Sequence, residues 1–172
     1  MVGCAAGIAA LGLLGTVGVG RAISHLTTPA RALNAPASIS GLPRVGDASA
    51  PTTASVAGQS LVSIASGVYG SGDVRYVLVA VSAGSVLGGR AAIVDAIAPQ
   101  VVGDQALDPA TKTTTNRAGA TFTCWRTTGP VGGAVCSWNA DGITGVVTQI
   151  GSADLSRAAD FAIAARGALS AG

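Results

Sequence analysis

The sequence predicts an α+β domain behind an N-terminal transmembrane helix. The domain is expected to be a two-layer sandwich, in which a mostly antiparallel sheet of about five strands (ββαβββα) carries two helices on one face. Three observations predict this fold. The run 1–20 is apolar and uncharged, tight-turn sequences at 70–73 and 139–142 separate strand-like segments, and apolar residues follow helical spacing in 86–98 and 153–169.

The composition limits what the protein can do. Of 172 residues, 34 are alanine and 25 are glycine, 10% are charged, and the formal net charge is +2. This length supports one domain with appendages. The high apolar fraction excludes a disordered chain, and the small net charge excludes the basic surface of a nucleic-acid-binding protein. One histidine and no glutamate leave few of the usual catalytic side chains.

Residues 1–20 contain no charge and no proline. As a helix they would span ~30 Å, enough to cross the hydrocarbon core of a bilayer. We expect an uncleaved anchor, which makes the lipid bilayer the first predicted partner. The alternatives are a buried soluble helix and a cleaved signal, with Ala-x-Ala sites at 30–32 and 35–37. Cleavage of residues 1–32 would release the domain as a secreted protein.

Two kinds of signal in the sequence predict opposite orientations for this segment. Arg21 and Arg31 follow it, which by the positive-inside rule would leave the domain in the cytoplasm. The cysteine pair described below and the proline-rich segment after it favour an extracytoplasmic domain. Because the run turns apolar at residue 2, we expect a short basic leader upstream of Met1.

Residues 21–52 are predicted to be a semi-extended basic linker. They contain four prolines among small polar residues, and three arginines against one aspartate give them a net charge of +2. The remaining chain, 53–172, is the predicted extracytoplasmic domain and carries seven basic against seven acidic residues. The excess charge therefore lies beside the membrane, where arginines can contact anionic headgroups.

The first half of the domain combines a hairpin with a helix. Segments 60–70 and 74–82 flank a Gly-Ser-Gly-Asp turn, and the second is apolar on both faces, which predicts a central strand. Segment 86–98 is predicted to be a helix that ends before Pro99. The polar stretch 103–117 is expected to be a surface loop.

The second half, residues 118–150, predicts a three-stranded meander. A hairpin centred on Pro130 places facing residues within ~5.5 Å, within reach of a disulfide. The predicted cross-strand pairs are Phe122 with Trp138, Cys124 with Cys136, and Trp125 with Val135. Asn139 begins the next turn, and Ser152 is the expected cap of a C-terminal helix over 153–169.

The spacing Cys-x11-Cys-x-Trp, followed by an acidic turn, Gly-x-x-Gly-Val-Val and an amphipathic helix, resembles a group of small actinobacterial membrane-anchored envelope proteins. The matching residues are Cys124, Cys136, Trp138, Asp141, Gly142, Gly145, Val146 and Val147. The resemblance extends over about residues 39–169 and is specific in 118–150. It implies an extracytoplasmic α+β domain behind one transmembrane helix, and it implies no activity. This chain departs from that group in lacking a long cytoplasmic leader.

The chemistry-bearing residues do not form a catalytic pattern. His25 lies beside the membrane segment, which leaves no histidine for a triad or a metal site in 53–172. Lys112 stands in the predicted polar loop, where a general-base lysine would lack the burial that it needs. Asp104 and Asp108 match no calcium-loop spacing. We therefore predict no catalytic residue, no metal site and no cofactor.

The cysteines and their aromatic neighbours are the remaining candidates. Cys124 and Cys136 are interpreted as a structural disulfide covered by Phe122 and Trp138; a redox pair would more often be close in sequence at a helix N-terminus. By alternation Trp125 faces away from the disulfide. A second interpretation of Trp125 with Arg126 is an aromatic binding site for a glycan or a protein of the envelope.

Three functions remain open. The first is a membrane-anchored cell-envelope protein whose disulfide-stapled domain has a binding or structural role without catalysis. The second is an extracytoplasmic sensor or carrier of a small apolar ligand, which requires a cavity between sheet and helices. The third is a hydrolase or thiol enzyme that uses Lys112 or the cysteines, and it requires a pocket lined by Lys112, a serine and an aspartate.

Overall fold

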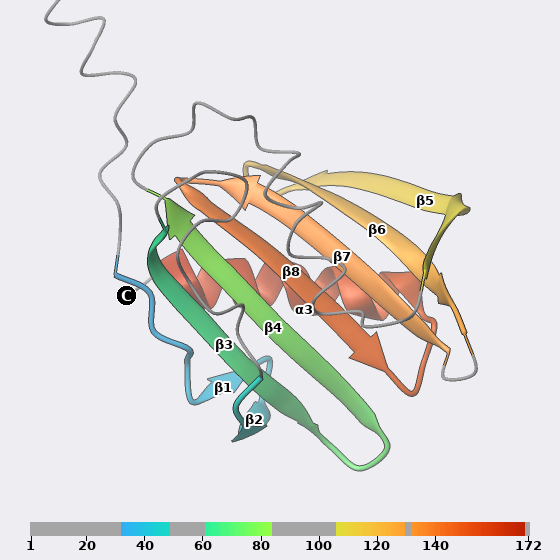
Figure 1. Ribbon diagram of the computed structural model, residues 1–172, viewed down its shortest axis with the longest axis horizontal. Helices are drawn as coiled ribbons and strands as arrows, with labels where there is room; N and C mark the ends of the chain where they lie inside the picture. The colour runs from blue at the N-terminus through green and yellow to red at the C-terminus, as the bar shows by residue number, and fades with distance from the viewer. Residues whose placement is uncertain (1–31, 49–60, 84–105, 130–131, 171–172) are drawn as a thin grey trace, which may run out of the picture.

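The computed structural model describes residues 32–48, 61–83, 106–129 and 132–170. Within them, eight strands form one antiparallel sheet, and one C-terminal helix lies on one of its faces (Figure 1). The elements are β1 (Ser38–Ile39), β2 (Leu42–Gly46), β3 (Leu61–Ser71), β4 (Val74–Ala83), β5 (Ala106–Arg117), β6 (Ala120–Thr128), β7 (Gly133–Ala140), β8 (Ile143–Ile150) and α3 (Leu155–Ser170). Their order across the sheet is β1-β2-β3-β4-β8-β7-β6-β5.

The predicted sheet of about five strands with two helices on one face is wrong. The described residues form eight strands and a single helix, because segments expected to be irregular are strands. The predicted loop 103–117 contains β5, an edge strand whose side chains are mostly exposed on both faces, so no apolar alternation marks it. The helix predicted at 86–98 lies outside the described residues.

The predicted membrane segment, residues 1–20, also lies outside the described residues. Within those that the structure describes, no helix is long and apolar enough to cross a membrane.

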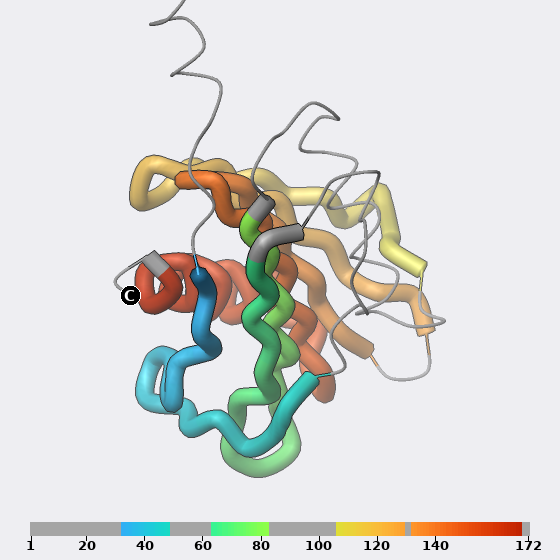
Figure 2. Tube along the Cα trace, turned by 60° about the vertical axis from the view of Figure 1, so that its left-hand side comes forward, coloured from blue at the N-terminus to red at the C-terminus, as the bar shows by residue number. Residues whose placement is uncertain are grey.

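The linker prediction is corrected for residues 32–48. They contribute β1 and β2 at one end of the sheet, and Leu33 and Ile39 are buried in the main core. The phenol of Tyr69 donates a hydrogen bond to the Pro36 carbonyl over 2.9 Å. Figure 2 shows this segment beside α3, which β1 contacts. The folded domain therefore begins before residue 53, by about residue 32.

The central meander follows the predicted register. Phe122 pairs with Trp138, Cys124 with Cys136, and Trp125 with Val135. Two-residue turns at 118–119 and 141–142 join the strands, and both residues of each turn have positive φ, including Ala118 at 52° and Asp141 at 54°. Such turns match the right-handed twist of the strands they connect.

The sheet buries apolar residues on both faces. The face that contacts α3, called here the helix face, carries the main core with Tyr69, Tyr76, Phe122 and Trp138. The opposite face carries a second cluster of four buried valines with Ala48, Ile64 and Leu107 partly buried against it. The valines are Val79, Val81, Val135 and Val146.

Helix α3 begins after Asp154, not after Ser152 as predicted. The Asp154 carboxylate accepts hydrogen bonds from the backbone N–H groups of Ser156 and Arg157 at 3.0 and 3.2 Å, which caps the helix. A stripe of buried small residues faces the sheet and ends at Leu169; its alanines are Ala158, Ala162 and Ala165. Phe161 stacks on Tyr76 with ring centroids 4.2 Å apart.

Arg166 connects α3 to the turns at 118–119 and 141–142. Its guanidinium donates to the Ala118 carbonyl and to the Asp141 carboxylate, the latter over 2.6 Å, and the side chain is only 14% exposed. We expect Arg166→Ala to lower the free energy of unfolding by about 2 kcal/mol, because it removes charge-assisted hydrogen bonds from two turns. Urea unfolding measures the loss.

The matched control for this prediction is Arg157→Ala, since the Arg157 side chain is 70% exposed beside Asp154. An exposed pair of this kind contributes little, and the control should shift stability by less than about 0.5 kcal/mol. Equal effects of the two variants would contradict the role of Arg166.

Candidate functional site

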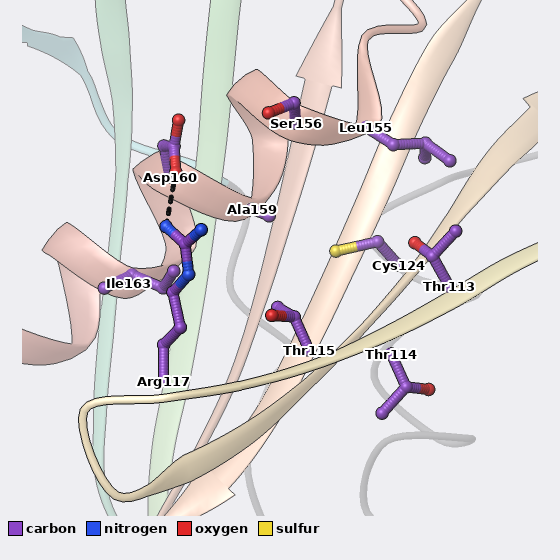
Figure 3. Close-up of a pocket in the computed structure, with 10 residues that line it drawn as sticks. All are labelled: Thr113, Thr114, Thr115, Arg117, Cys124, Leu155, Ser156, Ala159, Asp160 and Ile163. Atoms are coloured by element: carbon purple, nitrogen blue, oxygen red, sulfur yellow. Dashed lines mark ion pairs between the residues drawn. The ribbon is translucent and has the colours of Figure 1, made fainter.

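An open groove lies between the edge strand β5 and the first half of α3. Its volume is about 260 Å³, and β6 contributes Cys124 to its floor (Figure 3). The groove exists because α3 packs on β6, β7 and β8. The sheet extends beyond them by one further strand, β5.

The groove combines apolar and hydroxyl-bearing walls. Leu155, Ala159 and Ile163 line it from the helix, and hydroxyl groups line it from both sides. In Figure 3, Thr113 and Thr115 point toward α3, whereas Thr114 points away from it. This difference follows from the alternation of side chains along a strand. The groove can therefore contact an aliphatic group and hydrogen-bond to a polar one.

An ion pair connects the two walls. Arg117 Nη1 on β5 lies 3.6 Å from Asp160 Oδ1 on α3, and the two side chains are 65% and 66% exposed. An exposed pair at this distance stabilises the fold by at most about 1 kcal/mol. It leaves both charges at the surface, where a bound molecule can compete for them.

The structure confirms the disulfide between Cys124 and Cys136, whose Cα atoms are 4.1 Å apart. Both cysteines lie in the buried core on the helix face, together with Phe122 and Trp138, the predicted cover. The rings of those two aromatics are 6.0 Å apart and tilted.

Trp125 and Arg126 point to opposite faces of the sheet. Trp125 lies opposite Val135 on the face away from α3 and is half-buried. Arg126 is exposed on the helix side, where its Nε donates to the Ala153 carbonyl over 3.2 Å. The two side chains therefore do not form one surface.

The other candidates are separated as well. Lys112 is exposed on β5 and does not line the groove. Asp108 lies on the same strand and accepts a hydrogen bond from the Ala110 N–H over 3.0 Å. His25 and Asp104 lie outside the described residues. No group of three or more potential metal-ligating side chains occurs in the part of the chain that the structure describes.

The two tyrosines are neutral packing groups. Burial raises the pKa of Tyr69, against a smaller opposing effect of the Arg44 charge. Burial also raises the pKa of Tyr76, against smaller opposing effects of Arg157 and of a hydrogen bond with Gln149. Because the neutral phenols are favoured, neither tyrosine supplies a phenolate at neutral pH.

The sequence interpretation missed the groove because it assigned β5 to a loop. The one available signal was the run Thr113, Thr114 and Thr115, since threonine is enriched in strands. The helix wall was predicted correctly as an amphipathic helix, but a groove needs both walls.

Comparison of the chain with models of protein families, with curated proteins and with solved structures finds no match. The resemblance to actinobacterial envelope proteins therefore rests on the motif around Cys124, Cys136 and Trp138.

Proposed function

We propose that this protein is a membrane-anchored cell-envelope protein whose extracytoplasmic domain binds a partner and does not catalyse a reaction. The observation that carries the binding role is the open groove between β5 and α3. The disulfide supports the location, because such bonds persist in oxidising compartments outside the cytoplasm. The groove is the binding site under this proposal.

The groove lining supports binding rather than catalysis. Ser156 is the serine that lines the groove. The nearest carboxylate on α3 is that of Asp160, which forms an ion pair with Arg117. Neither histidine nor lysine lines the groove, so the serine hydroxyl has no general base there. The cysteine sulfurs are bonded to each other, which withholds a thiolate nucleophile.

The same geometry disfavours a carrier of small apolar ligands. Sites for such ligands are concave, mostly apolar and typically ~300–1,000 Å³ in volume. This groove has about 260 Å³, and hydroxyl groups and an ion pair form much of its lining. A ligand with both polar and aliphatic groups fits it better.

Location is tested in intact cells that express the full chain with a C-terminal epitope tag. We expect protease added outside the cells to remove the tag. We also expect Cys124 and Cys136 to react with maleimide only after reduction, in a Cys4→Ser background that leaves no third cysteine. Protection of the tag, together with two thiols reactive without reductant, would contradict the proposed location.

A further inference from the structure

We propose that a small uncharged thiol opens the disulfide from the groove, and that Cys124 is the sulfur that it modifies. The site is the floor of the groove between β5 and α3, to which β6 contributes Cys124. The modification is a reversible exchange of one disulfide for another. It goes beyond the proposed binding function and does not depend on the identity of a binding partner.

The two cysteines of the disulfide differ in access. Cys124 lines the groove, whereas Cys136 does not. In Figure 3 the Cys124 sulfur points into the space between Thr115 and α3. Cys124 is 2% exposed and Cys136 is 0% exposed. Access is one of the factors that decide which sulfur a thiolate attacks, and a thiol in the groove meets Cys124 first.

The fold shields Cys136 from the groove. Cys136 lies on β7, between Cys124 on β6 and Val147 on β8. Helix α3 packs on all three strands, and Val147 is itself fully buried. Attack at Cys136 would therefore require α3 to leave the sheet, whereas attack at Cys124 requires only entry into the groove.

The groove favours a small thiol that carries a hydroxyl group and no net charge. Its charged side chains, Arg117 and Asp160, form an ion pair, so their opposite charges balance. Its volume of about 260 Å³ admits a molecule of a few heavy atoms. The burial of Cys124 keeps out a cysteine on the surface of a folded partner. Threonine hydroxyls on β5 can bond to the hydroxyl group of the thiol, and the aliphatic side chains of α3 can contact its carbon atoms.

The chemical step is thiol–disulfide exchange. The thiolate of the small molecule attacks Cys124 Sγ, a new S–S bond forms between them, and the bond from Cys124 to Cys136 breaks. The electron pair of that bond stays on the Cys136 sulfur, which takes up one proton in place of the one that the attacking thiol released to solvent. The small thiol is oxidised, Cys136 is reduced to a free thiol, and Cys124 remains in a disulfide.

The modification would change both the hairpin and the groove. It removes the covalent link between β6 and β7, and it places the organic group of the thiol in the groove. Under the proposed binding function, on which this consequence rests, the modified domain could not hold its partner there. Attack by Cys136 on the mixed disulfide would release the small thiol and restore the original bond.

The first experiment tests whether the thiol reaches the disulfide in the folded domain. The full Cys4→Ser chain in detergent micelles is treated with 2-mercaptoethanol, quenched with acid and analysed by mass spectrometry. We expect the rate of reduction to rise in proportion to the thiol concentration. A rate that levels off at the unfolding rate would mean that the thiol reaches the bond only after unfolding, and it would overturn the inference.

The second experiment identifies the sulfur that is modified. In the Cys4→Ser background, Cys136→Ser leaves Cys124 as the single thiol, and Cys124→Ser leaves Cys136. The two variants lack the same bond and are therefore matched. The probe is 2-hydroxyethyl disulfide, which transfers the same organic group to a protein thiol. We expect Cys124 to be labelled roughly tenfold faster than Cys136, because only Cys124 lines the groove. Equal rates would contradict the assignment.

Groove-filling substitutions connect the reaction to the groove. Ala159→Leu on α3 and Thr113→Leu on β5 each add a larger side chain to the lining, and each should slow reduction of the intact disulfide roughly tenfold. Arg157→Leu is the control, since Arg157 is exposed on the same helix and does not line the groove. Unfolding would accelerate the reaction, so a slower reaction cannot come from a damaged fold.

Unchanged rates in both groove-filling variants would overturn the inference. None of these measurements involves a binding partner, so their failure would leave the proposed binding function standing. The location test in cells is likewise independent of them.

Discussion

A Gly145→Ala variant is expected to lose about 3 kcal/mol of unfolding free energy, at the upper end of the usual cost of overpacking a core. A Cβ at this position would stand 2.1 Å from Cζ2 of the Trp138 indole, and two further indole atoms lie within 2.5 Å. Gly145 pairs with Trp138 across β7 and β8, so the indole lies against bare backbone.

The indole cannot easily move aside. Trp138 is among the largest fully buried side chains, and Phe122 lies beside it in the same core. A shift of the ring would displace the cover of the disulfide, and a shift of the backbone would disturb β8 between its two neighbours. Urea unfolding and the near-ultraviolet circular dichroism of the tryptophans measure the effect.

The control is the same substitution on α3. Gly167 is exposed, and a Cβ there meets nothing within 4 Å. Gly167→Ala should stabilise the protein by up to about 1 kcal/mol, because glycine is a poor helix former. Trp138→Leu combined with Gly145→Ala should recover part of the loss, since the smaller side chain leaves room for the methyl group. Equal effects at Gly145 and Gly167 would contradict the packing argument.

The central hairpin could be predicted because its residues carry a strong pattern. Phe122, Cys124, Cys136 and Trp138 are large or reactive side chains at alternate positions, and one centre aligns them all. The pair of Trp138 and Gly145 was visible only as two residues of a motif. Their contact depends on the β7–β8 register, which aligns a glycine with an indole.

The edges of the sheet could not be predicted in the same way. β5 has no apolar face, and Leu33 and Ile39 are isolated apolar residues in a proline-rich stretch. In each case the strand or core position is set by tertiary pairing rather than by local pattern. Because β5 forms one wall of the groove, the groove could not be predicted from a sequence analysis that assigned this segment to a loop.

The helix start was misplaced for a more local reason. Ser152 and Asp154 are both good caps. The turn before α3 contains Gly151 with φ of 84°, and Asp154 is the residue whose carboxylate reaches the first N–H groups. Sequence position alone does not distinguish two caps that are two residues apart.

Removal of the disulfide in a Cys124→Ala, Cys136→Ala double variant is expected to lower the free energy of unfolding by about 3 kcal/mol. The bond joins residues that are 12 apart in sequence, and the loop it closes restricts the unfolded chain. Both cysteines are buried, so alanine also removes sulfur contacts in the core. The measurement is urea unfolding in a Cys4→Ser background, which prevents exchange with the third cysteine.

Adding a reductant separates the contribution of the disulfide bond to stability from that of the packing of the two sulfur atoms. Dithiothreitol should destabilise the Cys4→Ser protein by nearly as much as the double substitution and should leave the double variant unchanged. Reduction breaks the bond but keeps both sulfur atoms, whereas the double substitution also removes their contacts in the core. The difference between the two losses of unfolding free energy therefore gives the contribution of the sulfur contacts. If the double variant lost less than about 0.5 kcal/mol, the β6–β7 pairing would hold the hairpin without the staple, and loop closure would contribute little in this chain.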